Sequence, residues 1–237
     1  MASQHLWRAL PSWGHLWLAS SARLEAQDHK ATGYERPTSR TGGVEKGGLT
    51  QALAQKGVEQ TSKLYWADEM RIGLIGQVRR RWTPRGVKLR QRVAFGRVWR
   101  YLALAVDVVR GVLSWTWIEN MKGHSIARAV EVFKEAGVEA VVWDRAGGHR
   151  TLAVREVGVT LVEQPAASPE LNPAERVFEQ LRGKIEGCNY DDIEQKKAAV
   201  EAELKALAAD PAKVRSLTGW GWITDACQAL PSNAALL

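Results

Sequence analysis

Cysteine is scarce in this chain and long apolar runs are missing. Both shortages exclude certain classes of protein. Only two cysteines, Cys188 and Cys227, occur in 237 residues, and they form no CxxC pair. This argues against a disulfide scaffold and a structural zinc site, and it fits a reducing compartment. No apolar stretch is long enough to span a bilayer. Pro11, Ser12 and Gly14 interrupt the apolar start, which argues against a signal peptide.

Acidic residues are missing from one long stretch, residues 71–100, which we call the basic segment. It carries ten cations and no Asp or Glu, an excess larger than the net charge of +7 for the whole chain. Such a segment suits an acidic partner, and nucleic acid is the commonest one. The alternative is a solvated cationic hairpin. The cations expected to contact DNA are Arg79, Arg80, Arg81, Arg85, Lys88, Arg90 and Arg92. We expect Trp99, which lies among them, to pack in the core.

The overall composition is ordinary, but the first 62 residues differ from the rest. Apolar residues make up 45% and charged residues 25%, as in globular proteins. The stretch 27–48 is rich in Gly, Thr and charge, which predicts loop or disorder. Residues 49–60 could form a short helix. We therefore predict an irregular or partly disordered segment over 1–62, without a clear helix-turn-helix, and a folded domain over 63–237.

From Lys63 onward the apolar pattern predicts strands that alternate with helices. The strands are expected at 64–69, 98–109, 112–119, 138–144 and 159–164, the second and third forming a hairpin around Gly111. The helices are expected at 125–137, 149–158, 172–186 and 191–208. Ser125 is a possible helix cap and Pro173 suits a first turn. This order predicts an α/β fold with a sheet of mixed direction.

Three acids fall where such a fold can bring them together. Asp68 lies with Glu69 at the end of the first predicted strand, Asp144 ends a buried one, and Glu175 lies in the first turn of a helix after SPELNP (168–173). In open α/β sheets ligands gather beyond the carboxyl ends of the strands. Converging carboxylates need a cation, and two Mg²⁺ ions about 3.5–4 Å apart can clamp a phosphoryl displacement. The alternative is that these acids are solvated loop residues.

The segments that carry these acids resemble a known family. YWADEMRIGL (65–74), VVWDRAGGHR (141–150) and SPELNPAERVFEQLRGKI (168–185) look like the three catalytic blocks of mariner-like insertion-sequence transposases. Two further stretches are similar to the family: RRRWTPRG (79–86) and the end of the resemblance at 204–223. Members are DDE superfamily endonucleases with a ribonuclease H-like fold, a mixed five-stranded sheet flanked by helices.

The resemblance implies a chemistry and its partners. It assigns catalytic and metal-binding roles to Asp68, Asp144 and Glu175, with two ions of Mg²⁺ or Mn²⁺. Glu69 matches a frequent neighbour of the first aspartate and is not itself the expected ligand. The implied reaction is cleavage at the end of the insertion sequence, followed by attack of the freed 3′-hydroxyl on target DNA. The implied partners are the DNA at the element ends, the target DNA and a second copy of the chain in a homodimer. No membrane partner is implied. The resemblance also implies a location in the bacterial cytoplasm, at the nucleoid when the protein is bound to DNA.

Departures from the family leave alternatives open. Arg145 follows Asp144 where the family often has Asn or Gly, and it could stabilise the carboxylate or compete with a metal. His149 could touch the scissile phosphate or position a ligand, and a capping or packing role is about as well founded. The absent helix-turn-helix indicates a truncated copy, or a start that comes from unrelated or mis-framed sequence. The alternative function is an inactive, truncated remnant that only binds DNA. A ribonuclease H-type hydrolase is the third, and SPELNP argues against it.

Overall fold

The computed structural model describes residues 48–75, 84–88, 90, 94, 96–165 and 168–232. Its strands are β1 (Leu64–Gly73), β2 (Trp99–Asp107), β3 (Val112–Ile118), β4 (Ala140–Trp143) and β5 (Thr160–Glu163). Its helices are α1 (Leu49–Gln55), α2 (Gly123–Glu135), α3 (Leu152–Glu156), α4 (Ala174–Ile185), α5 (Ile193–Ala208), α6 (Pro211–Thr218) and α7 (Gly221–Gln228), with short 3-10 turns η3 (Gly147–Arg150) and η4 (Pro169–Leu171).

The five strands form one mixed sheet in the order β3-β2-β1-β4-β5. β1, β2 and β3 pair antiparallel, while β1 and β4, and β4 and β5, pair parallel. This confirms the predicted α/β fold with a mixed five-stranded sheet flanked by helices. It also confirms the hairpin, which turns at Gly111 with φ +72°. A Cβ there would lie 2.2 Å from the carbonyl oxygen of Pro211, so both the turn and the packing of α6 require glycine.

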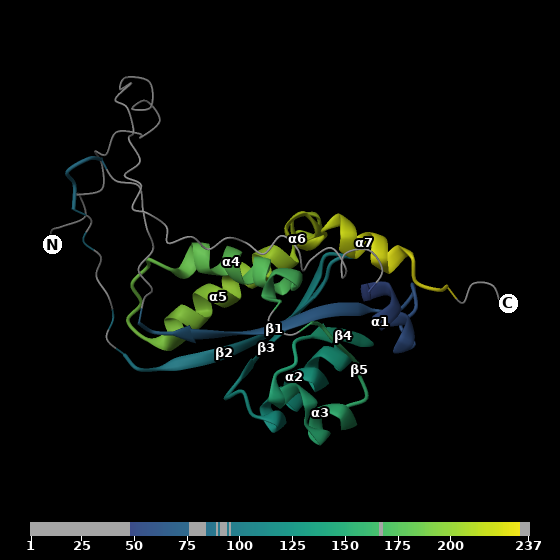
Figure 1. Cartoon of the computed structure of the whole chain (residues 1–237). Helices are drawn as coiled ribbons and strands as arrows, with labels where there is room; N and C mark the ends of the chain where they lie inside the picture. The colour runs from purple at the N-terminus through teal and green to yellow at the C-terminus, as the bar shows by residue number, and fades with distance from the viewer. Residues whose placement is uncertain are drawn as a thin grey trace. The chain divides into compact units, whose positions relative to one another are not determined.

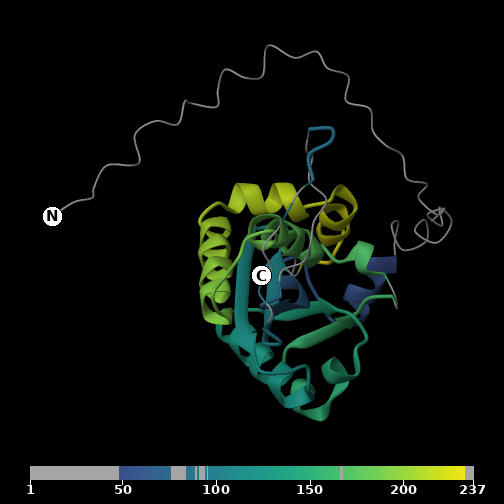
Figure 2. The same cartoon turned by 90° about the vertical axis from the view of Figure 1, so that its left-hand side faces the viewer.

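Two layers of helices cover the sheet. Figure 1 shows α4, α5, α6 and α7 on one side of the strands and α2 and α3 on the other. Figure 2, turned by 90°, shows the yellow helices α6 and α7 above the strands and the teal helix α2 below them. Each side has its own core, because successive side chains of a strand point to opposite faces. On β1, Trp66 and Met70 pack toward α4, whereas Tyr65 and Ala67 pack toward α2.

Several predicted boundaries differ from the structure. β1 continues four residues past the predicted end at Glu69, because its second half pairs with β2. α2 begins at Gly123, so Ser125 is not its cap; the Ser125 hydroxyl donates to Asn120 Oδ1 instead. The predicted helix at 149–158 is split into η3 and α3. α6 and α7 were not predicted.

The folded unit includes residues before 63. Leu53 of α1 and Val58 are buried in the core on the α4 side of the sheet. The short helix expected within 49–60 is therefore present as α1, and it packs against α7. Of the helices that the structure describes, none has the length and apolar character to cross a membrane.

Candidate active site

The parallel pairing of β1 with β4 determines where Asp68 and Asp144 lie. The last paired residues are Trp66 and Val142, and the two aspartates each follow two positions later. β1 and β4 are thus neighbours, as the convergence of these acids requires. Asp68 does not end its strand as predicted; it lies where β1 has passed the end of β4 and pairs only with β2.

The alternation along β1 separates the adjacent acids Asp68 and Glu69. Asp68 belongs to the face of Trp66 and Met70, which α4 covers. Glu69 belongs to the opposite face, where its side chain is 3% exposed and contacts His149. Asp68 accepts a hydrogen bond from the backbone N–H of Glu69 at 2.8 Å. The two carboxylates therefore have different surroundings although they are neighbours in the chain.

The surroundings of Asp68 change the acid–base behaviour of its carboxyl. Burial raises its pKa from the ordinary value of 3.8 to about 7, and the backbone N–H of Glu69 opposes this rise. The negative charge of Glu69 adds to it. The charges of Glu175 and Asp144 raise it further. Asp144 and Glu175 thus lie near enough to Asp68 for their charges to act on it.

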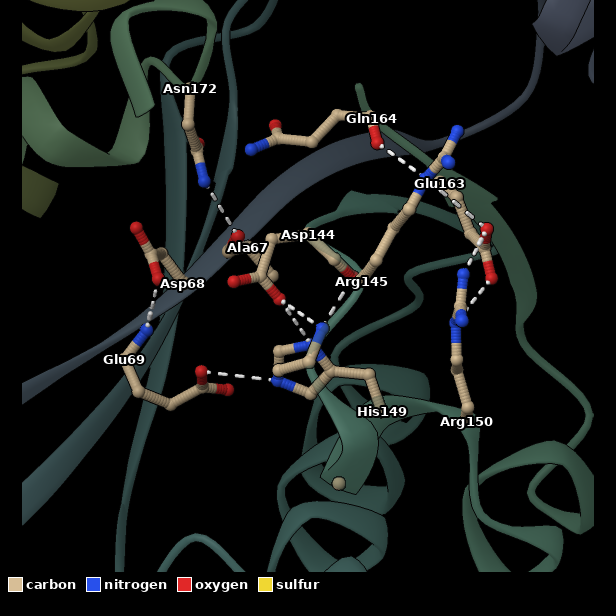
Figure 3. Close-up of polar contacts among 12 residues, drawn as sticks. Ala67, Asp68, Glu69, Asp144, Arg145, His149, Arg150, Glu163, Gln164 and Asn172 are labelled. Atoms are coloured by element: carbon tan, nitrogen blue, oxygen red, sulfur yellow. Dashed lines mark hydrogen bonds and ion pairs between the residues drawn. The ribbon is translucent and has the colours of Figure 1, made fainter. Parts of the chain in front are cut away.

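Glu175 is brought to this face by the loop before α4. The buried Asn172 donates from Nδ2 to the carbonyl oxygen of Ala67 at 2.9 Å and accepts from the backbone N–H of Ala174 at 3.1 Å. It therefore ties the start of α4 to β1 one residue before Asp68 (Figure 3). Glu175 lies in the first turn of α4 and is partly exposed, and its Oε2 lies 3.4 Å from Nη1 of Arg182.

His149 is buried between two carboxylates. Its Nδ1 lies 2.7 Å from Oδ1 of Asp144, and its Nε2 lies 3.2 Å from Oε2 of Glu69. The ring stacks on Trp143, with centroids 4.0 Å apart. Burial lowers the pKa of His149, but the bonds to Glu69 and the charge of Asp144 outweigh it and raise the pKa overall. For Glu69 the signs are reversed: burial raises the pKa of its carboxyl, and the hydrogen bond and charge of His149 only partly oppose this rise.

Arg145 does not contact the carboxylate of Asp144. Its Nε donates to the carbonyl oxygen of Gln164 at 3.1 Å and lies 3.5 Å from Glu163 Oε2. Figure 3 shows it pointing away from Asp144, toward β5. Arg150 donates two hydrogen bonds to the same Glu163, at 2.9 and 2.8 Å, and so lowers the pKa of that carboxyl. The side chain after Asp144 is therefore held by the neighbouring strand.

A cleft of about 530 Å³ opens beside Asp144 and His149. Its lining includes the cations Lys56, Arg150 and Arg155 and the edge strand β5. Among the residues that the structure describes, no three Asp, Glu, His or Cys side chains lie close enough together to hold one metal ion.

The structure describes part of the basic segment. Arg85, Lys88 and Arg90 are exposed, whereas Arg79, Arg80, Arg81 and Arg92 lie outside the described residues. The expectation that Trp99 packs in the core is wrong. Its side chain is 47% exposed at the start of β2, and the guanidinium of Arg71 lies 5.7 Å from the centre of its ring. The core of β2 begins three residues later, at Leu102.

Sequence reasoning missed three residues that shape this site. Asn172 lies within SPELNP, where a polar residue before the first turn of a helix is a capping signal. Glu69 was set aside as a neighbour of Asp68; the period of two along a strand indicates that it must face the other layer. Trp143, which supports His149, looked like ordinary core of a buried strand.

Comparison with known proteins identifies the family. The family described as DDE superfamily endonuclease matches residues 63–197. The Tcb1 transposase of Caenorhabditis briggsae is 37% identical over 60 residues, which cover 25% of this chain and 22% of that protein. Among solved structures, the Mos1 mariner paired-end complex with Mg is similar with a TM-score of 0.51 and 16% identity, covering 85% of this chain and 68% of that one.

The Mos1 strand transfer complex is similar with a TM-score of 0.51 and 13% identity, over 76% of this chain and 59% of that one. This chain therefore matches less than two thirds of the length of the Tcb1 transposase and of the Mos1 chain in the strand transfer complex. At such identities the likeness of the structures concerns the fold, and it confirms the predicted ribonuclease H-like fold. Together with the family match over more than half of the sequence, it confirms the predicted resemblance: the chain belongs to the DDE superfamily endonucleases.

Proposed function

We propose that this domain is the catalytic domain of a DNA transposase, which cuts and joins phosphodiesters with divalent cations held by Asp68, Asp144 and Glu175. The observation that carries the proposal is where the elements place these acids. Asp68 and Asp144 each lie two residues beyond the last paired residues of the neighbouring strands β1 and β4, and Asn172 ties the helix of Glu175 to β1. Asp68 from β1 is acted on by the charges of Asp144 and Glu175, which come from two other elements. Repulsion of this kind is relieved by a cation, and carboxylate oxygens suit Mg²⁺ and Mn²⁺.

The donor atoms fit such an ion. Asp68 Oδ1 and Asp144 Oδ1 accept hydrogen bonds from backbone groups, whereas neither Oδ2 accepts one from the described residues. A bound ion would neutralise charge on a phosphate and favour an oxygen nucleophile. The protein's own part is to hold the carboxylates: Asn172 anchors the helix of Glu175, and the buried strands β1 and β4 carry the aspartates. Mos1 complexes with Mg and with Mn have a similar fold, which supports the choice of ions.

DNA is the proposed substrate. The exposed Arg85, Lys88 and Arg90, with the other cations of the basic segment, would contact phosphates. The similar Mos1 structures are a strand transfer complex and a paired-end complex. By analogy we propose element ends and target DNA as partners, a dimer that holds two ends, and a place of action on the DNA of a bacterial cytoplasm.

One observation favours the second candidate, an inactive remnant that only binds DNA. As described, the acids are not gathered tightly enough for three of them to share one ion, and Glu175 contacts Arg182. A protein of this kind would bind DNA in a salt-sensitive way and would not cleave it in Mg²⁺ or Mn²⁺.

Cleavage assays separate the two candidates. Supercoiled plasmid, and duplexes that carry the DNA on either side of the coding sequence, are incubated with the protein in Mg²⁺, Mn²⁺ or EDTA. The proposal predicts nicking that requires the metal and is abolished by Asp144→Asn. Asp225→Asn, an exposed aspartate of α7, is the matched control and should cleave normally. DNA binding without any metal-dependent cleavage by the wild type would establish the remnant instead.

A further inference from the structure

Next to the proposed metal ligands lies a buried polar pair that ion binding does not by itself explain. The side chains of Glu69 and His149 are 3% and 4% exposed, and His149 links Glu69 to Asp144 through its two ring nitrogens. Figure 3 shows both carboxylates reaching this one imidazole. Burying a carboxylate and an imidazole is unfavourable compared with an apolar pair of the same size, so space filling alone does not account for them.

The protons of this pair can be arranged in two ways, and both direct the same bond at Asp144. In one, an imidazolium donates to two carboxylates. In the other, a protonated Glu69 donates to Nε2 of a neutral ring. In each case Nδ1 carries a proton: it donates to the backbone carbonyl oxygen of Asp144 at 3.3 Å, which can only accept, and lies 2.7 Å from Oδ1 of the same residue. The bond to Asp144 therefore does not depend on which partner holds the second proton.

These contacts limit the rotation of the Asp144 carboxylate. Oδ1 accepts from the backbone N–H of Ala146 at 3.0 Å and lies 2.7 Å from Nδ1 of His149, which also bonds to the carbonyl oxygen of Asp144. Oδ2 accepts no hydrogen bond from the described residues. The side chain is 48% exposed, so a ligand could reach this oxygen. The ring of His149 is itself held by its stacking on Trp143. One oxygen is thus held by the protein and the other is left for a ligand.

We propose that Glu69 and His149 are positioning residues, a buried relay that fixes the Asp144 carboxylate and leaves Oδ2 as its ion-binding atom. The inference rests on the proposed function, because it assigns the relay to the proposed metal site. Groups that orient a metal ligand in this way change metal affinity by about 10–100-fold when they are removed. Glu69 acts through His149, and His149 acts through Asp144.

Two substitutions of His149 separate positioning from packing. In His149→Asn the amide nitrogen falls near the place of Nδ1, so a donor to Asp144 is kept and the contact with Glu69 is lost. In His149→Gln the amide reaches toward Glu69 and the donor to Asp144 is lost. We expect the Mn²⁺ dissociation constant from calorimetry to rise about 10–100-fold in His149→Gln and clearly less in His149→Asn. His124→Gln, an exposed histidine, is the control.

The possible results decide different claims. Equal losses of affinity in the two variants, in step with their melting temperatures, would reduce His149 to a packing residue and overturn the relay while leaving the transposase proposal intact. A wild-type protein that binds no Mn²⁺ would overturn both. One readout needs no metal: the imidazole nitrogen shifts of the metal-free protein in NMR should show a protonated Nδ1. An unprotonated Nδ1 would overturn the relay alone.

Discussion

In the metal-free protein, ionisation of Asp68 should lower the free energy of unfolding. Asp68→Asn, which carries no charge, should remove this loss of stability. The pKa of Asp68 is raised by burial to about 7, against an ordinary value of 3.8. Because the folded-state pKa is the higher one, the stability that the protonated carboxyl contributes is fully present below about pH 4. It is lost as the pH rises through about 7. At ~1.4 kcal/mol for each tenfold change, the loss is on the order of 4 kcal/mol by pH 8.

Urea unfolding of both proteins at pH 4, 6 and 8 in EDTA measures this difference. Asn is nearly the same size as Asp and carries no charge. The variant should therefore exceed the wild type in free energy of unfolding by on the order of 4 kcal/mol at pH 8 and by less than about 1 kcal/mol at pH 4. Asp225→Asn on the surface of α7 is the matched control. A difference that stays constant from pH 4 to pH 8 would refute the reasoning.

Mg²⁺ supplies a second arm of the same experiment. A ligand that binds only the folded state raises its stability in proportion to the logarithm of its concentration. Saturating Mg²⁺ should therefore stabilise the wild type at pH 8 and have little effect on Asp68→Asn. Equal stabilisation of both proteins would mean that the ion binds away from Asp68.

Three further predictions concern the surroundings of the acids. Asn172→Ala removes bonds to Ala67 and Ala174, so it should lower the free energy of unfolding by about 1–3 kcal/mol in urea titrations; an unchanged free energy would contradict the anchoring role of Asn172. Arg182→Ala releases Glu175 and should tighten Mn²⁺ binding in calorimetry while changing stability by no more than about 1 kcal/mol; weaker binding would contradict this. The third changes exposed cations of the basic segment together to Gln: Arg85, Lys88 and Arg90. Fluorescence anisotropy should show weaker DNA binding and a salt slope smaller by up to about 0.9 for each lost phosphate contact; an unchanged slope would place the DNA elsewhere.

Much of the sheet was predictable because its strands have clear chemical patterns. The apolar runs around Trp66 and Val142 indicated buried strands, and the acids that follow them lie beyond the parallel pairing of β1 and β4. The end of β1 was not predictable in the same way. Its second half pairs only with β2, and no local signal separates that half from a loop. α6 and α7 have eight residues each, too short for a strong periodic pattern.

The site was predictable in its residues and less so in their contacts. The positions of the acids at predicted strand ends and in a first helical turn, together with the resemblance, indicated Asp68, Asp144 and Glu175, whose roles remain proposals. The contact between Glu69 and His149 joins positions 80 residues apart, and it depends on how η3 packs under β1. The pairing of Glu175 with Arg182 lies within one helix at seven residues, about two turns, so the sequence did contain a signal for it.

Anomalous diffraction from crystals soaked in MnCl₂ tests the proposed metal site most directly. We expect manganese bound by carboxylate oxygens of Asp68, Asp144 and Glu175, with Asp144 contributing Oδ2 and its Oδ1 still next to Nδ1 of His149. Manganese bound elsewhere, or held by one of the three acids alone, would contradict it.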